Sequence, residues 1–189
     1  TNKIFDINAT EYLDTTNIDP YDNNIIFSKY TYMVEADIAN TPKTLELSNS
    51  SAIINNSASD NSSIVLAIPV NQLLKLDGIQ DHSLFSRNVR LWTGKTRVNK
   101  DLANTIKDNS EHDRFFLYHN GVSITCSDYD FEPSNNQIKI SGYQVINGCQ
   151  SLVSFYQNKE NLSDRMLVLA KIIKVEPQSP LIQKITKNA

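Results

Sequence analysis

Residues 114–150, RFFLYHNGVSITCSDYDFEPSNNQIKISGYQVINGCQ, decide the fold of this chain. Two apolar runs, 115–118 and 122–126, meet at His119-Asn120-Gly121, and a third, 143–146, ends at Asn147-Gly148. An Asn-Gly pair at the end of a buried run is a place where the backbone can take positive φ and expose its N–H groups. The two pairs therefore predict two tight turns, each at the end of a strand.

The second turn leads directly into a segment whose apolar spacing suits a buried or amphipathic helix at about 149–158. A strand, a glycine turn and a helix N-terminus can together hold an anion on free backbone amides and the positive end of the helix dipole. The same arrangement also serves as a plain chain reversal. The residues alone leave both interpretations open.

Composition places the chain among soluble globular proteins. Its 189 residues are 40% hydrophobic and 21% charged, with a net charge of -3, so it has no general electrostatic attraction to nucleic acid or to an anionic membrane. Length allows one sizeable core. No apolar run is long enough to cross a bilayer and no signal-peptide pattern precedes residue 10, so we expect a cytoplasmic location without membrane contact.

Cysteine usage and the chain ends add two expectations. Cys126 and Cys149 are too few and too far apart for a zinc site, which predicts buried reduced thiols. The chain starts without methionine and stops within an apparent helix at 181–186, so we expect a piece of a longer protein.

The predicted fold class is α/β or α+β, with a mixed sheet flanked by helices. Strands are expected at 25–36, around 45–47, at 63–68, and at 166–175 as a central strand. Helices are expected after Pro69, with Pro69 as the first helical residue, and at 98–106. We divide the chain into a strand-containing segment with an Asn/Ser-rich loop, 1–63, and a core, 64–189.

A cluster of cations without acidic neighbours lies between His82 and Lys100. It holds Arg87, Arg90, Lys95, Arg97 and Lys100, interleaved with Asn88, Trp92, Gly94 and Asn99. Arginine forks and lysine point charges suit phosphate recognition. A solvated face whose arginines pair with distant carboxylates explains the cluster equally well.

Metal chemistry has a weaker basis. Asp128, Asp130 and Glu132 alternate along a predicted strand and share one face, with Lys139 and Lys171 available for a metal-dependent nuclease. The same run also suits a solvated hairpin end. His82, His112 and His119 form no ligand pair, so no metal site is predicted from them. His119 either titrates near neutral pH and alters anion affinity, or simply closes its turn.

Four blocks carry a resemblance to a known family. They are LFSRNVRLWTG (84–94), VNKDLANTI (98–106), FFLYHNGVSIT (115–125) and YQVINGCQS (143–151). In this order they resemble the AIPR family, the abortive infection phage resistance proteins, across about residues 64–189. The family usually shows Asn-Asn-Gly where this chain has His119-Asn120-Gly121, and Gln-Thr where it has Gln150-Ser151. Residues 1–60 resemble nothing we can name, and family members are normally longer.

The resemblance implies a bacterial anti-phage defence protein that often acts beside restriction-modification or other defence-operon partners. It implies no established reaction, catalytic residue or cofactor. The segment 143–158 is also loosely similar to the phosphate-binding turn of ParB-like proteins. We therefore expect a module that senses a nucleotide or nucleic acid, and a metal-dependent nuclease component or a non-catalytic interaction scaffold remain alternatives. The predicted ligand-binding residues are Asn120, Gly121, Asn147, Gly148, Gln150, Ser151, Arg87, Asn88, Arg90 and Arg97.

Overall fold

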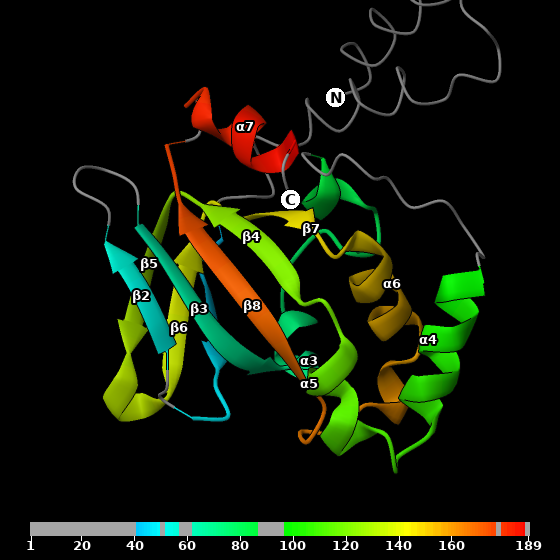
Figure 1. Cartoon of the computed structure of the whole chain (residues 1–189). Coiled ribbons are helices and arrows are strands. Elements are labelled where there is room, and N and C mark those ends of the chain that lie inside the picture. The colour runs from blue at the N-terminus through cyan, green and yellow to red at the C-terminus, as the bar shows by residue number, and fades with distance from the viewer. Residues whose placement is uncertain (1–40, 50–51, 57–61, 87–96, 177–178, 188–189) are drawn as a thin grey trace, which may run out of the picture.

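The computed structural model describes residues 41–49, 52–56, 62–86, 97–176 and 179–187. Within these ranges the chain forms two sheets and several helices (Figure 1). The predicted α+β class with a mixed sheet is confirmed. The predicted strand at 25–36 lies outside the described residues.

The larger sheet has five strands in the order β2-β3-β8-β4-β7. All neighbours are antiparallel except β4 and β8, which run parallel, so the sheet is mixed. Isoleucine, valine and leucine at alternate positions give β3 and β8 one fully buried face. The strands are β2 (Ala52–Asn56), β3 (Ser62–Pro69), β4 (Val122–Cys126), β7 (Gln144–Asn147) and β8 (Leu167–Lys174).

A second, three-stranded antiparallel sheet has the order β1-β6-β5. It contributes Leu45, Ile138 and Ile140 to the same hydrophobic core as the larger sheet. Its polar residues alternate with these and face solvent. The strands are β1 (Lys43–Glu46), β5 (Asp128–Glu132) and β6 (Gln137–Ser141), and a short turn at Pro133–Asn135 joins the last two.

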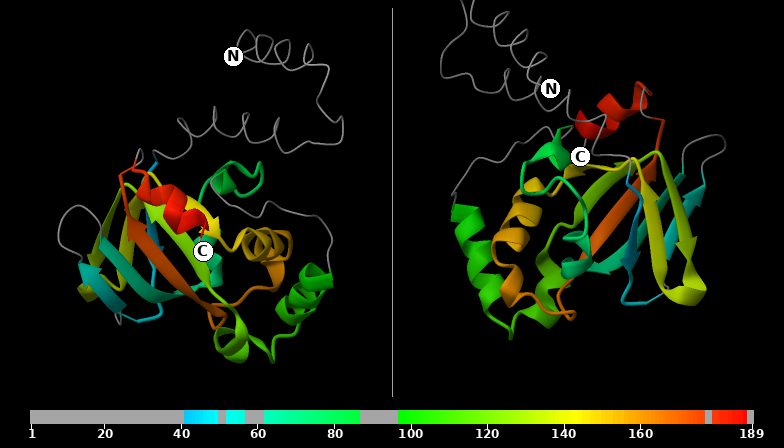
Figure 2. Two further views of the ribbon diagram at one scale, coloured as in Figure 1. Left: turned by 45° about the horizontal axis from the view of Figure 1, so that its top comes forward. Right: turned by 180° about the vertical axis from the view of Figure 1, so that it is seen from behind.

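Helices cover part of one face of the larger sheet. α6 (Cys149–Gln157) packs its Leu152 and Phe155 into the core, and α4 (Arg97–Lys107) lies against the outer side of α6. The view from behind shows α6 and α4 beside the three-stranded sheet (Figure 2). The remaining helices of the described residues are α3 (Val70–Leu73), α5 (Phe115–Tyr118) and α7 (Leu181–Lys187), with single turns at Ser83–Phe85, His112–Arg114 and Lys159–Asn161.

The opposite face of the larger sheet faces the viewer in Figure 1, and α7 lies beyond the end of β8. On this face Leu169 and Lys171 of β8 are exposed, since the strand alternates between its two sides. In the described part of the chain, no helix is long and apolar enough to cross a bilayer.

Several sequence expectations match the elements. β3, α4, α6 and β8 confirm the predicted segments, and β8 is the middle strand of its sheet. Two expectations are wrong. Residues 115–118 form a helical turn instead of a strand, and Pro69 ends β3 and caps α3 instead of starting the helix. A four-residue apolar run has no distinguishing period, so packing of Phe115 beneath α6 decides its conformation.

Candidate functional site

The two Asn-Gly turns lie side by side. β4 begins directly after Gly121, and β7 ends at Asn147, directly before Gly148. These strands pair antiparallel with Ser123 opposite Asn147, so the start of one lies beside the end of the other. Two segments separated by the whole hairpin at 128–141 therefore meet at one corner of the sheet.

Both turns need glycine because their backbones pack closely, Gly148 against Val122 at the start of β4 and Gly121 against Leu169 of β8. Gly121 has φ 80° and Gly148 has φ 102°, a region that residues with a Cβ rarely adopt. A Cβ on Gly148 would lie 2.6 Å from Val122 Cγ1, and a Cβ on Gly121 would lie 2.5 Å from the Leu169 carbonyl oxygen. The expectation of positive φ at the two turns is confirmed at the glycine of each pair.

His119 joins the first turn to the start of α6. The Gly121 N–H donates to His119 Nδ1 at 2.9 Å, and Nε2 lies 2.8 Å from Ser151 Oγ. A backbone N–H only donates, so Nδ1 accepts and the neutral imidazole carries its proton on Nε2. Nε2–H then donates to Ser151 Oγ. This tautomer offers no base to the hydroxyl, so the pair is not an activated serine nucleophile.

The His119 ring is held among aromatic side chains. It stacks on Phe115, with ring centroids 4.8 Å apart, and lies 5.7 Å from the Phe155 ring. Burial lowers the pKa of His119 to about 4. The imidazole is therefore neutral at neutral pH and closes the turn, and the interpretation that it titrates near neutral pH is wrong.

α6 begins at this corner. Gly148 is its N-cap, and its carbonyl accepts the first helical hydrogen bond from the Leu152 N–H at 3.0 Å. The positive end of a nine-residue helix thus lies beside the Asn120-Gly121 turn. The arrangement combines a helix N-terminus, the Ser151 hydroxyl and the asparagines of the two adjoining turns, residue types that anion sites use.

Two side-chain hydrogen bonds attach the flanks of the segment 87–96 to the same region. The Ser86 hydroxyl donates to Gln144 Oε1 on β7 at 2.5 Å, and Asn99 Nδ2 donates to Gln150 Oε1 on α6 at 2.8 Å. The residues just before and just after the segment are therefore held at the strand and the helix that frame Gly148. Gln150 uses its carbonyl oxygen to join α6 to α4.

The predicted ligand-binding residues fall into two groups. Asn120 is exposed, Gly121 is buried, and the other four are half-buried, all within the corner made by the two turns: Asn147, Gly148, Gln150 and Ser151. Arg87, Asn88 and Arg90 lie outside the described residues. Arg97 begins α4, and its side chain is outside the description.

Sequence reasoning included His119 closing its turn among its interpretations, but it missed the long-range contacts that organise the corner. The contact of His119 with Ser151, and the tethers through Ser86 and Asn99, join residues 32, 58 and 51 positions apart. No local period encodes such pairs. The only available signal is that His119 and Asn99 lie within or beside the quoted blocks.

The acidic residues of β5 lie in a solvent-exposed environment. Asp128, Asp130 and Glu132 share the exposed face of β5, as the alternation predicts. Lys174 Nζ lies 2.7 Å from Asp128 Oδ1, and Lys139 stands opposite Asp130 in the ladder. The hydrogen bond from Lys174 to Asp128 raises the pKa of that lysine. Within the described ranges no three His, Cys, Asp or Glu residues are grouped to hold a metal ion.

Both cysteines are buried free thiols, as expected. Burial raises the pKa of Cys126 to about 12, so its thiolate does not form near neutral pH. Cys149 occupies the first turn of α6 with its side chain in the core.

Comparison with models of known protein families assigns residues 85–189 to a family. The model of the AIPR family, described as "AIPR protein", matches residues 85–189, more than half of the chain. The chain belongs to the AIPR family. The AIPR match includes both Asn-Gly turns, all of α4 and α6, and every predicted ligand-binding residue. No curated protein and no solved structure matches the chain. Membership of the AIPR family relates the chain to abortive infection and phage resistance.

Proposed function

We propose that this AIPR region is a sensing module of an anti-phage defence protein, and that it binds a phosphate-bearing ligand, a nucleotide or a nucleic acid, at the two Asn-Gly turns. The observation that supports it is the meeting of the two turns at the start of α6, joined by the bond from His119 to Ser151. Partners from the same defence operon and a cytoplasmic setting remain part of the proposal.

Three kinds of hydrogen-bond donor recognise the ligand in this proposal: a hydroxyl, side-chain amides and guanidinium groups. His119 Nε2–H occupies one lone pair of Ser151, so the Ser151 hydroxyl keeps its own proton to donate to a ligand oxygen. Asn120 and Asn147 supply amide donors from the two turns. His119 is neutral, so the positive charge that phosphate requires comes from arginines of the 87–97 segment, whose flanks are tethered at Gln144 and Gln150.

Thermal unfolding of the 189-residue chain with inorganic phosphate, nucleotides and short DNA or RNA tests the proposal. Binding to the folded state raises the melting temperature as ligand concentration rises. Ser151→Ala is expected to weaken binding by about tenfold, because a hydrogen bond to a charged group contributes about 1.5 kcal/mol.

Two matched variants make that result specific. Ser151→Thr keeps the hydroxyl and is expected to retain binding, and Ser134→Ala removes an exposed hydroxyl from the distant hairpin and is expected to change nothing. A melting temperature that no phosphate compound shifts, or an equal loss with Ser134→Ala, would show that the corner is only a chain reversal.

A further inference from the structure

The strand β2 forms one edge of the five-stranded sheet. In the described part of the chain it pairs only with β3, and its outer backbone groups have no strand partner there. Figure 1 shows it at the end of the sheet opposite β7. An edge strand presents a row of N–H and C=O groups that can accept another strand.

The described residues of this edge carry none of the charges or prolines that protect natural edges. Its sequence, Ala-Ile-Ile-Asn-Asn, has no charge and no proline, and Ile53 and Ile54 are 73% and 49% exposed. The described β3 residues beside it, from Ser62 to Leu66, are uncharged as well. Soluble proteins usually place lysine, proline or a bulge at such an edge to prevent pairing. Exposed branched apolar side chains on an open edge are costly unless another strand covers them.

We propose that β2 pairs antiparallel with β2 of a second copy of this chain, which joins the two five-stranded sheets across a twofold axis. A twofold interface uses the same surface on both copies and must be self-complementary. An uncharged strand meets this requirement because its self-pairing brings no like charges together. A charged peptide would find no opposite charge on β2.

The register follows from strand length. Centring the axis on Ile54 pairs all five residues, with Ala52 opposite Asn56 and each Ile54 opposite its counterpart. Directly opposite residues lie on the same face of a sheet with Cβ atoms about 5 Å apart, so the two Ile54 side chains cover each other.

Another exposed apolar surface among the described residues is the outer side of α5. Leu117 is 80% exposed, and Phe116 and Tyr118 flank it. A four-residue helix presents no extended row of N–H and C=O groups with which a strand could pair. Leu117 therefore provides the matched control for Ile54.

Sedimentation equilibrium of the 189-residue chain over a wide concentration range tests the proposal. The wild-type chain is expected to pass from monomer to dimer, and Leu117→Lys is expected to behave in the same way. Ile54→Lys is expected to remain monomeric with an unchanged circular dichroism spectrum. A wild-type chain that stays monomeric at every concentration, or a dimer that Leu117→Lys abolishes and Ile54→Lys does not, overturns the proposal.

Cross-linking gives a second measurement of the register. Ile54→Cys is expected to yield a covalent dimer with a short bismaleimide, whereas Ser134→Cys, on the distant hairpin, yields none. Cys126 and Cys149 are buried and contribute no background. A dimeric sample in which Ile54→Cys does not cross-link also overturns the proposal.

Discussion

His119 links the first Asn-Gly turn to α6, the helix that starts directly after the second turn. Its imidazole accepts from the Gly121 N–H and donates to Ser151, so both nitrogens are used in the neutral form. Adding a proton to Nδ1 would place two donors face to face across the 2.9 Å contact with Gly121. Both desolvation and hydrogen bonding therefore favour the neutral ring in the folded chain.

This neutrality predicts a pH-dependent stability. The folded pKa of His119, about 4, lies below its ordinary value of 6.5, so the unfolded chain binds more protons between these values. The stabilisation is fully present above pH 6.5 and is lost as pH falls toward 4, by about 3 kcal/mol for this group. Urea unfolding at a series of pH values measures how the free energy of unfolding changes with pH.

His119→Asn isolates this contribution, since asparagine does not titrate. The difference in unfolding free energy between the wild type and the variant is expected to shrink between pH 6.5 and 4. A difference that stays constant across this range would contradict the lowered pKa of His119. Titration of the carboxylates cancels because both chains share it.

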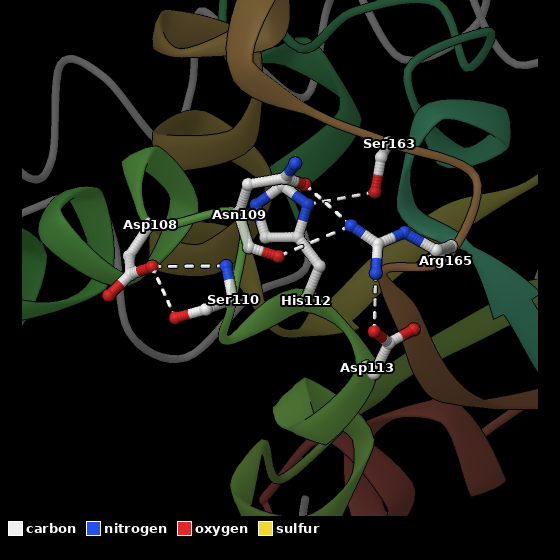
Figure 3. Close-up of polar contacts among 7 residues, drawn as sticks. All are labelled: Asp108, Asn109, Ser110, His112, Asp113, Ser163 and Arg165. Carbon is white, nitrogen blue, oxygen red and sulfur yellow. Dashed lines mark hydrogen bonds and ion pairs between the residues drawn. The ribbon is translucent and has the colours of Figure 1, made fainter.

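At the scale of elements, the connection between α4 and α5 is tied to the loop that precedes β8. Figure 3 shows dashed contacts from Arg165 to Asn109 and Asp113, and from the neighbouring His112 ring to Ser163. His112 is 1% exposed, and its Nε2 donates to the Ile106 carbonyl at the end of α4. Hydrogen bonds from Ser110 lower the pKa of Asp108 in the same connection. These contacts fix where α5, and hence the first Asn-Gly turn, begins.

The buried histidine should stabilise this connection more than the exposed ion pair. His112→Ala removes buried volume and leaves the Ile106 carbonyl without its donor, at a cost of about 3 kcal/mol. Arg165→Ala breaks a pair whose side chains are both about half exposed, which costs under about 1 kcal/mol. Urea unfolding of both variants measures how much unfolding free energy each substitution removes. An equal or larger loss of free energy for Arg165→Ala would contradict this prediction.

At the scale of the whole molecule, the two sheets share one core. Leu45, Ile138 and Ile140 of the small sheet belong to the same buried cluster as the strands of the large sheet and α6. The consecutive strands β1 (Lys43–Glu46) and β2 (Ala52–Asn56) belong to different sheets. The division of the chain into segments 1–63 and 64–189 remains a prediction. The cooperativity of unfolding tests it.

A shared core predicts one cooperative transition. Ile140→Ala in β6 and Ile172→Ala in β8 each remove a fully buried side chain from this cluster, so each is expected to cost about 3 kcal/mol. Both variants should lower the midpoint of the same transition, followed by far-ultraviolet and near-ultraviolet circular dichroism at fixed concentration. Separate transitions, each sensitive to one variant, would show two independent units.

How far sequence predicts this structure depends on the range of the interactions. β3, α4 and α6 follow from periods of apolar residues, and the hairpin at 128–141 follows from alternation and a proline-asparagine turn. The run 115–118 is too short to show a period, and α3 spans only Val70–Leu73. For the candidate site, the two turns were predictable and their partners were not.

The amino-acid sequence by itself determined the glycine turns, the main helices and strands, and the family blocks, because each rests on neighbours a few residues apart. Only the tertiary structure decided that the two turns meet, that His119 is neutral and holds Ser151, and that β2 pairs with β3 alone among the described strands. Strand order and side-chain pairing depend on residues far apart along the chain, and these contacts exist only after the sheets have packed around their common core.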